Sequence, residues 1–295
     1  MPITILEIKF QVEKPLTFQG YSGFASRGII YELLRSVDAE YAEHLHSSPR
    51  LAPFSSTPIL TLTPKGWSIV YERLPAPSIC KIRFTLLERE ITSRVFEALA
   101  GDAPIRLQGV EVLPLEVSVE QVKYSQLLEG GKPVRSFSVE FLTPTYFRFS
   151  PLIASRLFPF RLPPGGVDAR RLRRARRFHP LPEPIMMMRS LLRLWRSYSD
   201  SHFNYPRYNR WITSMGVSLS GFPEGIKTVR LYEDEALRRF IVGFRGVVQY
   251  SLPEDLYRKR WARITDALLR FAEYSHVGGG RTAGLGMIRY IPKEN

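Results

Sequence analysis

The sequence predicts an α+β fold in which one small unit of strands and helices occurs twice in tandem. Three observations support this prediction. Apolar and polar residues alternate from Leu6 to Glu13, which is typical of a half-buried strand. Apolar residues then recur at helical spacing from Phe24 to Val37. A new alternating segment begins at Phe137, just after the break from Gly130 to Pro133, so the order of elements starts again there.

The first unit, assigned to residues 1–132, continues with a short second helix. Asp38 is placed to cap that helix, which is expected to end near His46 because Ser47-Ser48-Pro49 follows. Extended segments are expected over 59–63, 68–73 and 81–87, a helix over 89–99, and more strand over 106–119. Elements in this order are typical of a ferredoxin-like domain with its split βαβ topology.

The second unit, assigned to residues 133–295, contains a long basic insert over 151–184 before its first helix over 185–199. Strands are expected near 211–219, 228–232 and 240–250. Ser251 to Glu254 form a capping box with proline in the first turn, so the last helix is expected to begin there. The two units share no sequence repeat, and the duplication is inferred from the order of their elements.

The charge of the chain points to a polyanionic partner. Its 295 residues carry a net charge of +14, which favours nucleic acid first and an acidic membrane surface second. No apolar run approaches the roughly 18 residues of a membrane span, and the alternating N-terminus is not that of a signal peptide. The lone Cys80 excludes an internal disulfide and a CxxC site. We therefore expect a cytoplasmic protein without a membrane partner and without a metal or other cofactor.

A glycine-rich loop follows the last predicted helix and precedes an apolar strand over 287–291. Gly278 to Gly286 include five glycines. The order helix, loop, strand is opposite to that of a dinucleotide-binding turn, and no Lys-Ser/Thr pair follows as in a P-loop. The glycines allow the backbone to approach an extended anion, with Gly278, Gly279, Gly280, Arg281 and Thr282 as the predicted contacts. A tight turn that requires positive φ angles is the structural alternative.

Four segments of the chain together resemble one protein family. They are the glycine-rich loop, Gly243 to Gly246, Phe141 to Thr145, and a histidine just after the first helix, within Ala42 to His46. These segments resemble Cas6, the endoribonuclease of the repeat-associated RNA-binding (RAMP) superfamily that cuts precursor CRISPR RNA within its repeats. The resemblance implies two ferredoxin-like domains and metal-independent cleavage on the 3′ side of the repeat. It also implies products with 2′,3′-cyclic phosphate and 5′-hydroxyl ends.

Histidine is the expected proton carrier, because RNA cleavage without a metal requires a proton to leave the 2′-hydroxyl and another to reach the leaving 5′-oxygen. The family often uses a tyrosine, a histidine and a lysine or arginine, which Tyr31, His46 and Arg50 match one by one. Lysine is the usual third residue. Other members use a His-x-His pair, so His44 is the second candidate for proton transfer. Tyr31 is expected on the helix face turned away from the core, together with Arg27.

Each of these residues also has a plainer interpretation. His44 and His46 could cap a helix end or lie in solvent, and Tyr31 could be an ordinary surface tyrosine. A His-x-His metal site is rejected, because no nearby Cys or HExxH partner is present. The acidic run Glu233 to Glu235 could hold Mg²⁺, but it is better interpreted as a solvated turn.

RNA-binding candidates lie in several parts of the chain. The segment from Arg170 to Arg177 has six arginines in eight residues and could grip phosphates or remain a solvated run. Its predicted contacts are Arg170, Arg171, Arg173 and Arg174. Arg27 and Arg281 are further candidates, and Arg281 is expected to be exposed at the crest of the glycine loop. Aromatic and basic residues alternate from Phe203 to Trp211, which suits base stacking, although such density is more typical of a core.

The leading hypothesis is therefore an endoribonuclease whose partner is CRISPR repeat RNA. The alternative is a non-catalytic RNA-binding subunit of a CRISPR effector complex, and a protein that docks on an acidic membrane ranks last. Other effector subunits and a second copy of the chain are possible partners. The sequence leaves open whether the repeat forms a hairpin and which of His44 and His46 is the acid.

Overall fold

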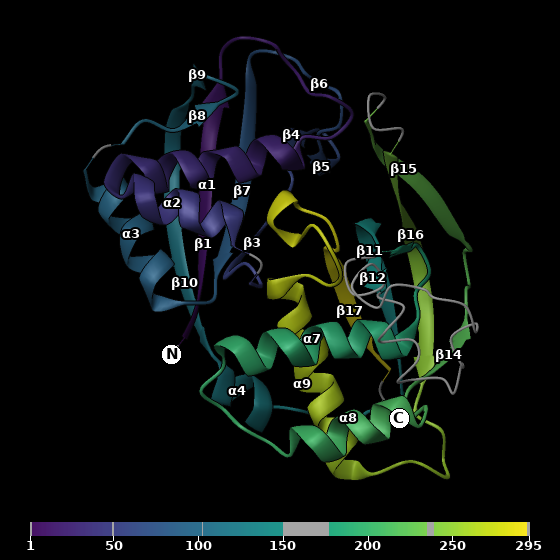
Figure 1. The fold of residues 1–295 in the computed structure, drawn as a ribbon. Coiled ribbons are helices and arrows are strands. Elements are labelled where there is room, and N and C mark those ends of the chain that lie inside the picture. The colour runs from purple at the N-terminus through teal and green to yellow at the C-terminus, as the bar shows by residue number, and fades with distance from the viewer. Residues whose placement is uncertain (1, 49, 102, 150–176, 235–238, 294–295) are drawn as a thin grey trace, which may run out of the picture.

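The structure is a computed structural model that describes residues 2–48, 50–101, 103–149, 177–234 and 239–293. Two main antiparallel β-sheets lie side by side, and helices cover one face of each (Figure 1). The six-stranded sheet belongs to the first half of the chain and the five-stranded sheet to the second half. The structure confirms the predicted α+β fold with tandem ferredoxin-like units.

The first sheet has the strand order β10-β1-β7-β4-β5, with β3 paired to β7. Its strands are β1 (Pro2–Val12), β3 (Phe54–Ser56), β4 (Leu60–Thr63), β5 (Gly66–Ile69), β7 (Ser78–Leu86) and β10 (Leu113–Lys123). Helices α1 (Gly23–Val37), α2 (Ala39–Ser47) and α3 (Arg89–Ala100) lie on one face. Two small two-stranded sheets complete the unit, β2 (Leu16–Thr17) with β6 (Arg73–Leu74) and β8 (Arg106–Leu107) with β9 (Val110–Glu111).

The second sheet has the strand order β14-β16-β11-β17, with β15 also paired to β16. Its strands are β11 (Ser136–Thr145), β14 (Ser218–Gly221), β15 (Ile226–Asp234), β16 (Arg239–Ser251) and β17 (Ile288–Pro292), and β12 (Phe147–Phe149) pairs separately with β13 (Arg177–His179). The helices are α4 (Tyr124–Glu129), α7 (Pro184–Tyr198), α8 (Tyr205–Thr213) and α9 (Lys259–Ser275), with a single 3₁₀ turn η1 (Arg281–Ala283) in the glycine-rich loop.

The hydrophobic cores do not divide at one point of the sequence. Ile3, Ile5 and Tyr124 come from the first half of the chain, yet they belong to the same buried cluster as Phe137 and Phe271 of the second half. The domain boundary between residues 132 and 133 therefore stays a prediction.

The prediction of a strand over 211–219 is wrong, because residues 205–213 form helix α8 and the strand begins only at Ser218. Asn204 caps this helix by accepting the backbone N–H of Arg207 at 3.1 Å. Tyr208, Trp211 and Ile212 then lie on one face and are buried. The aromatic residues of this segment thus pack in the core, as their density suggested.

The last helix begins later than expected, at Lys259 instead of Ser251. Ser251 is the final residue of β16, where it is paired with Ser136 of β11. Pro253 and Glu254 form a turn in which their carbonyls accept the N–H groups of Leu256 and Tyr257. Ser251, which the pattern placed at the N-cap of the helix, is therefore part of the sheet.

Candidate active site and RNA interface

His46 and Tyr31 meet where α2 folds back along α1. Their rings make an edge-on contact, with centroids 5.4 Å apart and planes at 82°. His46 is exposed, whereas Tyr31 is only 8% exposed because His46 and Phe54 lie against its ring. The expectation that Tyr31 faces solvent is therefore wrong. Burial raises the pKa of Tyr31, although the charges of Arg27 and Arg35 oppose it, so the phenol stays protonated at neutral pH.

The turn between α1 and α2 depends on Asp38. Its carboxylate accepts the backbone N–H of Tyr41 at 2.8 Å, which caps α2 as predicted. It also accepts Nε of Arg94 in α3 at 3.0 Å. These two bonds, the Tyr41 N–H first, lower the pKa of Asp38. The cap holds α2 against α3 and so sets the direction from which His46 reaches Tyr31.

His44 and Arg50 are two and four residues from His46 in the sequence and are not part of this ring contact. Both side chains are exposed. His44 is two residues before His46, so at about 100° per residue it points from a different side of the helix. The backbone N–H of Arg50 donates to Ser48 Oγ at 3.2 Å, and the charge of its guanidinium counteracts the rise that burial causes in the pKa of Tyr198. The roles of all four predicted catalytic residues stay predictions.

The segment after α2 is bound at two consecutive carbonyl groups by the second half of the chain. The hydroxyl of Tyr198 in α7 donates to the carbonyl of Leu51. Nη2 of Arg281 donates to the carbonyl of Ala52 at 3.0 Å, and its Nη1 donates to the carbonyl of Ser275 at 3.0 Å. Arg281 is only 6% exposed, and burial lowers its pKa to about 10. The expectation of an exposed arginine at the crest of the loop is therefore wrong, since the side chain turns inward to these carbonyls.

The glycines of the loop are required by contacts with the protein itself. A Cβ atom on Gly286 would lie 1.8 Å from the carbonyl oxygen of Val277, and one on Gly279 would lie 2.4 Å from the ring of Tyr146. The N–H of Gly279 donates to the Tyr146 carbonyl at 2.9 Å, so it points inward. Close packing thus accounts for two of the glycines without a ligand. The predicted RNA contacts of Gly278, Gly279, Gly280 and Thr282 stay predictions, and these residues are partly exposed.

Side chains from the first half of the chain anchor this loop and the end of α9 before it. Each donates to a backbone carbonyl of the second half. Tyr21 donates to Gly284 at 2.8 Å, Ser56 to Thr282 at 2.7 Å, Ser55 to Tyr274 at 2.8 Å and Arg83 to Glu273 at 3.1 Å. The loop before β17 therefore lies beside β3 and α1, on the same side of the molecule as α2 (Figure 1).

His276, at the start of the loop, is an unsuitable proton carrier. It is 1% exposed, and its Nδ1 has no hydrogen-bond partner among the described residues. Its backbone has φ of 59° and ψ of 173°, a region that glycine favours. Burial, and then the charges of Arg83 and Arg281, lower the pKa of His276 well below its usual value, so the ring is neutral at neutral pH.

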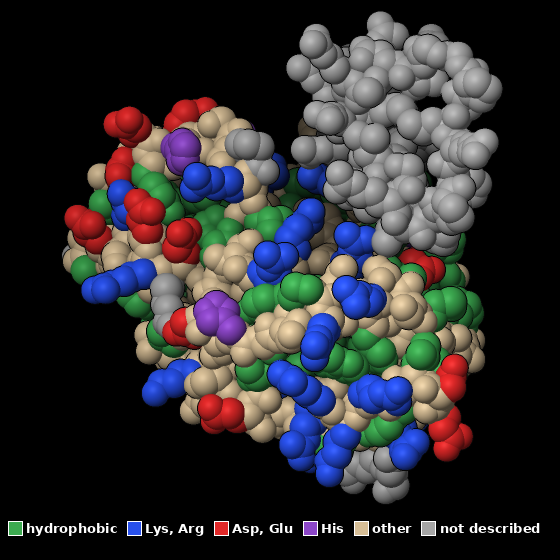
Figure 2. Space-filling model, turned by 60° about the horizontal axis from the view of Figure 1, so that its bottom comes forward, with side chains coloured by type: hydrophobic (Ala, Val, Ile, Leu, Met, Phe, Trp, Pro, Cys, Tyr) green, Lys and Arg blue, Asp and Glu red, His purple; other side chains and the backbone are tan. Residues whose placement is uncertain are grey.

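A stripe of arginines on α7 was missed by the sequence interpretation. Arg189, Arg193 and Arg196 recur at the i, i+4, i+7 spacing of one helix face, and that spacing could have revealed them. Their helix borders the glycine-rich loop, because the N–H of Gly278 lies 3.5 Å from Ser190 Oγ. Figure 2 shows many Lys and Arg side chains on the side of the molecule where α7 and α8 lie. Helices α8 and α9 also carry exposed arginines, namely Arg207, Arg210, Arg260 and Arg263. The predicted contacts Arg170, Arg171, Arg173 and Arg174 lie outside the described residues.

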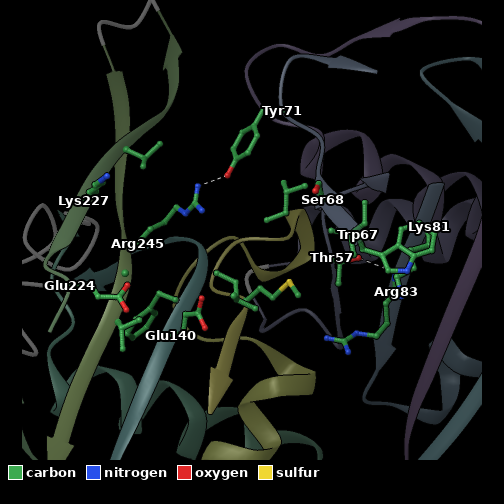
Figure 3. A pocket seen from close by; sticks show the side chains of 18 of the residues that line it. Thr57, Trp67, Ser68, Tyr71, Lys81, Arg83, Glu140, Glu224, Lys227 and Arg245 are labelled. Atoms are coloured by element: carbon green, nitrogen blue, oxygen red, sulfur yellow. Dashed lines mark hydrogen bonds between the residues drawn. The ribbon is translucent and has the colours of Figure 1, made fainter. Parts of the chain in front are cut away.

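A separate cleft of about 960 Å³ lies between the two sheets (Figure 3). Arg245 donates to the hydroxyl of Tyr71 across it, and Lys81 lies over the ring of Trp67, with 4.7 Å from Nζ to the ring centroid. None of the predicted catalytic residues lines this cleft. We therefore place the candidate active site at the end of α2 instead.

Two further sequence questions concern metals and membranes. No group of three His, Cys, Asp or Glu side chains is placed to hold a metal ion within the part of the chain that the structure describes. Glu235 of the acidic run lies outside that part. No helix among the described residues is long and apolar enough to span a bilayer.

Comparison with known proteins identifies the family to which this chain belongs. The family model for CRISPR-associated endoribonuclease Cas6 matches residues 139–288. Because the match covers half of the chain, the chain belongs to the Cas6 family. No curated protein sequence matches the chain.

Solved structures agree with this family. Thermus thermophilus Cas6 (TTHB231) in a product complex has a TM-score of 0.70 and 22% identity, over 99% of this chain and 100% of that one. Cas6 (TTHA0078) in a product complex has a TM-score of 0.63 and 20% identity, over 98% and 99%. A Cas6-related protein from Pyrococcus furiosus has a TM-score of 0.53 and 13% identity, over the whole of both chains. At these identities the likeness shows the fold.

Proposed function

We propose that this protein is an endoribonuclease that cuts CRISPR repeat RNA without a metal ion. The observation that carries the proposal is the contact between the exposed imidazole of His46 and the protonated, buried Tyr31. This pair lies in a member of the Cas6 family, on the side of the molecule where the glycine-rich loop packs against α1. A structural neighbour is described as an RAMP protein binding different RNA substrates, and we extend RNA binding to this chain.

In the proposed reaction the 2′-hydroxyl of the nucleotide before the cut attacks the adjacent phosphorus. Its proton passes to a base while the bond from the 2′-oxygen to phosphorus forms. The bond from phosphorus to the 5′-oxygen then breaks, and that oxygen takes a proton from an acid. The products are a 2′,3′-cyclic phosphate and a 5′-hydroxyl.

His46 is the first candidate for one of the two proton transfers, and His44 is the second. Both are exposed near the end of α2 and can reach a bound strand. Tyr31 supports the ring of His46 and can donate its phenolic proton to a phosphate oxygen. Arg50, which is exposed four residues after His46 in the sequence, is proposed to supply positive charge for the dianionic phosphorane.

The RNA is proposed to lie across the exposed arginines of α7 toward the end of α2. Arg189, Arg193 and Arg196 can neutralise successive phosphates along one helix face. Arg27, which is partly exposed on α1, is the proposed contact near the cut. The glycine-rich loop borders both helices, so its exposed edge can contact the same strand.

The deciding experiment compares cleavage of the cognate repeat RNA in EDTA by the wild type and by His46→Ala. We expect wild-type cleavage to persist in EDTA and the variant to be slower by about 10²-fold or more, with unchanged RNA affinity. His202→Ala removes another exposed imidazole and is the matched control. A repeat with a 2′-deoxynucleotide before the cut should bind and remain intact. Full cleavage by His46→Ala would remove His46 from the mechanism.

The alternative is a binding-only subunit of a CRISPR effector complex. It would bind the repeat with the same basic face but would leave every repeat tested intact. Cleavage of the cognate repeat by the wild type, with products that carry a cyclic phosphate, would support the endoribonuclease and exclude the binding-only subunit.

A further inference from the structure

The segment that follows α2 crosses from one hydrophobic core to the other. Leu45 of α2 packs against the core of the first half of the chain, whereas Leu51 packs against the core of the second half. Ala52, the next residue, packs again against the first core. Arg50 directly precedes this crossing point. The direction in which its side chain leaves the backbone therefore depends on both halves of the molecule.

Tyr198 is a contact that the second half makes at the crossing point. Its hydroxyl donates to the carbonyl of Leu51, and its ring packs against the second core. Burial raises the pKa of Tyr198 to about 12, so the hydroxyl keeps the proton that it donates at neutral pH. The charges of Arg281 and Arg50 oppose this rise, and the charge of Glu88 adds to it. The charge of Arg50 therefore acts directly on the hydroxyl that holds the next residue.

The end of α7 is a fixed support for Tyr198, the last residue of that helix. Trp195, three residues earlier, is fully buried, and its Nε1 donates to the carbonyl of Ser201 at 2.9 Å. The hydroxyl of Ser199 donates to the same carbonyl at 3.1 Å and accepts the N–H of Ser201 at 2.9 Å. These bonds fix the residues on both sides of Tyr198, so its hydroxyl is presented from a rigid element.

The side chain of Arg50 has no comparable anchor. It is exposed, and no acidic side chain among the described residues forms an ion pair with it. Its backbone N–H donates to Ser48 Oγ at 3.2 Å. A free arginine side chain has many rotamers, so the region that its charge can reach is set by the backbone on either side. On the C-terminal side, that backbone is held where Tyr198 binds Leu51.

We propose that Tyr198 is a positioning residue for RNA cleavage, which directs Arg50 toward the scissile phosphate by fixing the carbonyl of Leu51. The inference rests on the proposed function, in which Arg50 stabilises the phosphorane. Helix α7 also carries the stripe of arginines proposed to bind the RNA. One rigid helix thus aligns both the RNA strand and the arginine that acts on it. A displacement of about 1 Å at a reacting group can lower a rate by about 10²-fold.

A double-mutant cycle tests whether Tyr198 acts through Arg50. Tyr198→Phe keeps the ring and removes the donor. We expect single-turnover cleavage of the cognate repeat at saturating RNA to become about tenfold slower, with RNA affinity unchanged. In the Arg50→Ala background the same substitution should change the rate less than about twofold, because the positioned group is absent. Tyr257→Phe removes a similar bond, from a phenol to the Pro133 carbonyl at 3.1 Å. It is the matched control and should leave the rate unchanged.

Limited proteolysis measures the order of this segment without any RNA. Trypsin cuts after arginine, and the peptide bond between Arg50 and Leu51 must open locally before it can be cut. We expect this bond to be cut about fivefold faster in Tyr198→Phe, the factor that loss of one hydrogen bond gives in an opening equilibrium. The wild type and Tyr257→Phe should be cut at equal rates. Mass spectrometry identifies the fragment that begins at Leu51.

The outcomes separate this inference from the proposed function. Equal trypsin rates in the wild type and Tyr198→Phe would overturn the inference, and so would a loss of cleavage rate that persists in the Arg50→Ala background. Faster proteolysis of Tyr198→Phe with wild-type cleavage kinetics would remove the positioning role alone. A wild type that leaves its cognate repeat intact would contradict the proposed function and the role of Arg50 together.

Discussion

At the scale of single residues, the contact between Tyr31 and His46 depends on ring packing more than on the phenol. The ring of Tyr31 lies between His46 and Phe54, with centroid distances of 5.4 and 5.9 Å. A buried ring of this kind restricts the orientations that the exposed imidazole can adopt. Tyr31 is thus placed to position His46 whether or not its hydroxyl reaches the RNA.

Substitution of Tyr31 separates these two roles. We expect Tyr31→Phe, which keeps the ring, to lower the rate constant of single-turnover cleavage by less than about tenfold, or 1.4 kcal/mol. Tyr31→Ala should lower it by about 10²-fold and also cost roughly 3–5 kcal/mol of stability, because it leaves a cavity. Equal loss of rate in Tyr31→Phe and Tyr31→Ala, with RNA affinity unchanged, would show that the phenol itself acts in catalysis.

Arg281 is a second residue whose role follows from its contacts. Removal of its guanidinium leaves the carbonyls of Ala52 and Ser275 without their donor. Because an unsatisfied buried acceptor costs about 1–3 kcal/mol, we expect Arg281→Met to lower the free energy of unfolding by roughly 2–5 kcal/mol. The rate of cleavage should fall with it, since the segment after His46 is released. Denaturant unfolding and single-turnover kinetics measure both effects.

The outcome that contradicts this role is a loss of RNA affinity in Arg281→Met with unchanged unfolding. That result would return Arg281 to the RNA interface. Arg189→Met is the comparison, since it removes a partly exposed arginine from the nearby face of α7. As a proposed phosphate contact, it should affect RNA affinity and leave the free energy of unfolding unchanged.

At the scale of elements, the junction between α9 and the glycine-rich loop should make stability depend on pH. His276 is buried and neutral there, with a pKa well below its usual value. The unfolded chain binds a proton at this residue near pH 6.5, whereas the folded chain does not. The stability that the neutral imidazole of His276 contributes is therefore fully present above about pH 6.5. It is lost as the pH falls below that value, by at most about 1.4 kcal/mol per pH unit.

Comparison with His276→Asn isolates this contribution. Asparagine does not titrate and tolerates a positive φ better than most residues. We expect the difference in unfolding free energy between the wild type and His276→Asn to shift in favour of the variant as the pH falls from about 7 to 5. A difference that stays constant over this interval would contradict the assignment of a buried, neutral imidazole.

At the scale of the whole molecule, the basic face determines how affinity responds to salt. Neutralisation of about six phosphates of a single strand predicts that log K falls with log salt at a slope of roughly −4. Simultaneous substitution of Arg189, Arg193 and Arg196 by alanine should reduce that slope by about 2, through the loss of three phosphate contacts. Fluorescence anisotropy over a range of salt concentrations measures it. An unchanged slope would place the RNA on another face.

Much of this architecture could be predicted because local patterns agree with the final packing. The alternation along β1, the apolar stripe of α1 and the cap at Asp38 are all properties of neighbouring residues, and the structure contains each of them. The segment 211–219, for which a strand was expected, contains β-branched and aromatic residues, which favour strands. The Asn204 cap and the burial of Tyr208 and Trp211 outweighed that local preference.

The candidate site was only partly accessible from the sequence. The chemistry of histidine drew attention to His44 and His46, and helical spacing would also have revealed the arginines of α7. The burial of Tyr31 and Arg281 could not be read in this way. Their burial depends on α2 folding over α1 and on a loop more than two hundred residues later that packs against both β3 and α1.

The sequence by itself determined the repeated α+β order, the basic character of the protein and the residue types available for proton transfer. These features depend on composition and on contacts within a helix or strand, which neighbours in the chain specify. Only the tertiary structure decided that Gly279 and Gly286 serve close packing and that Arg281 binds backbone carbonyls. Such features depend on which distant segments meet, and no local pattern encodes a meeting of that kind.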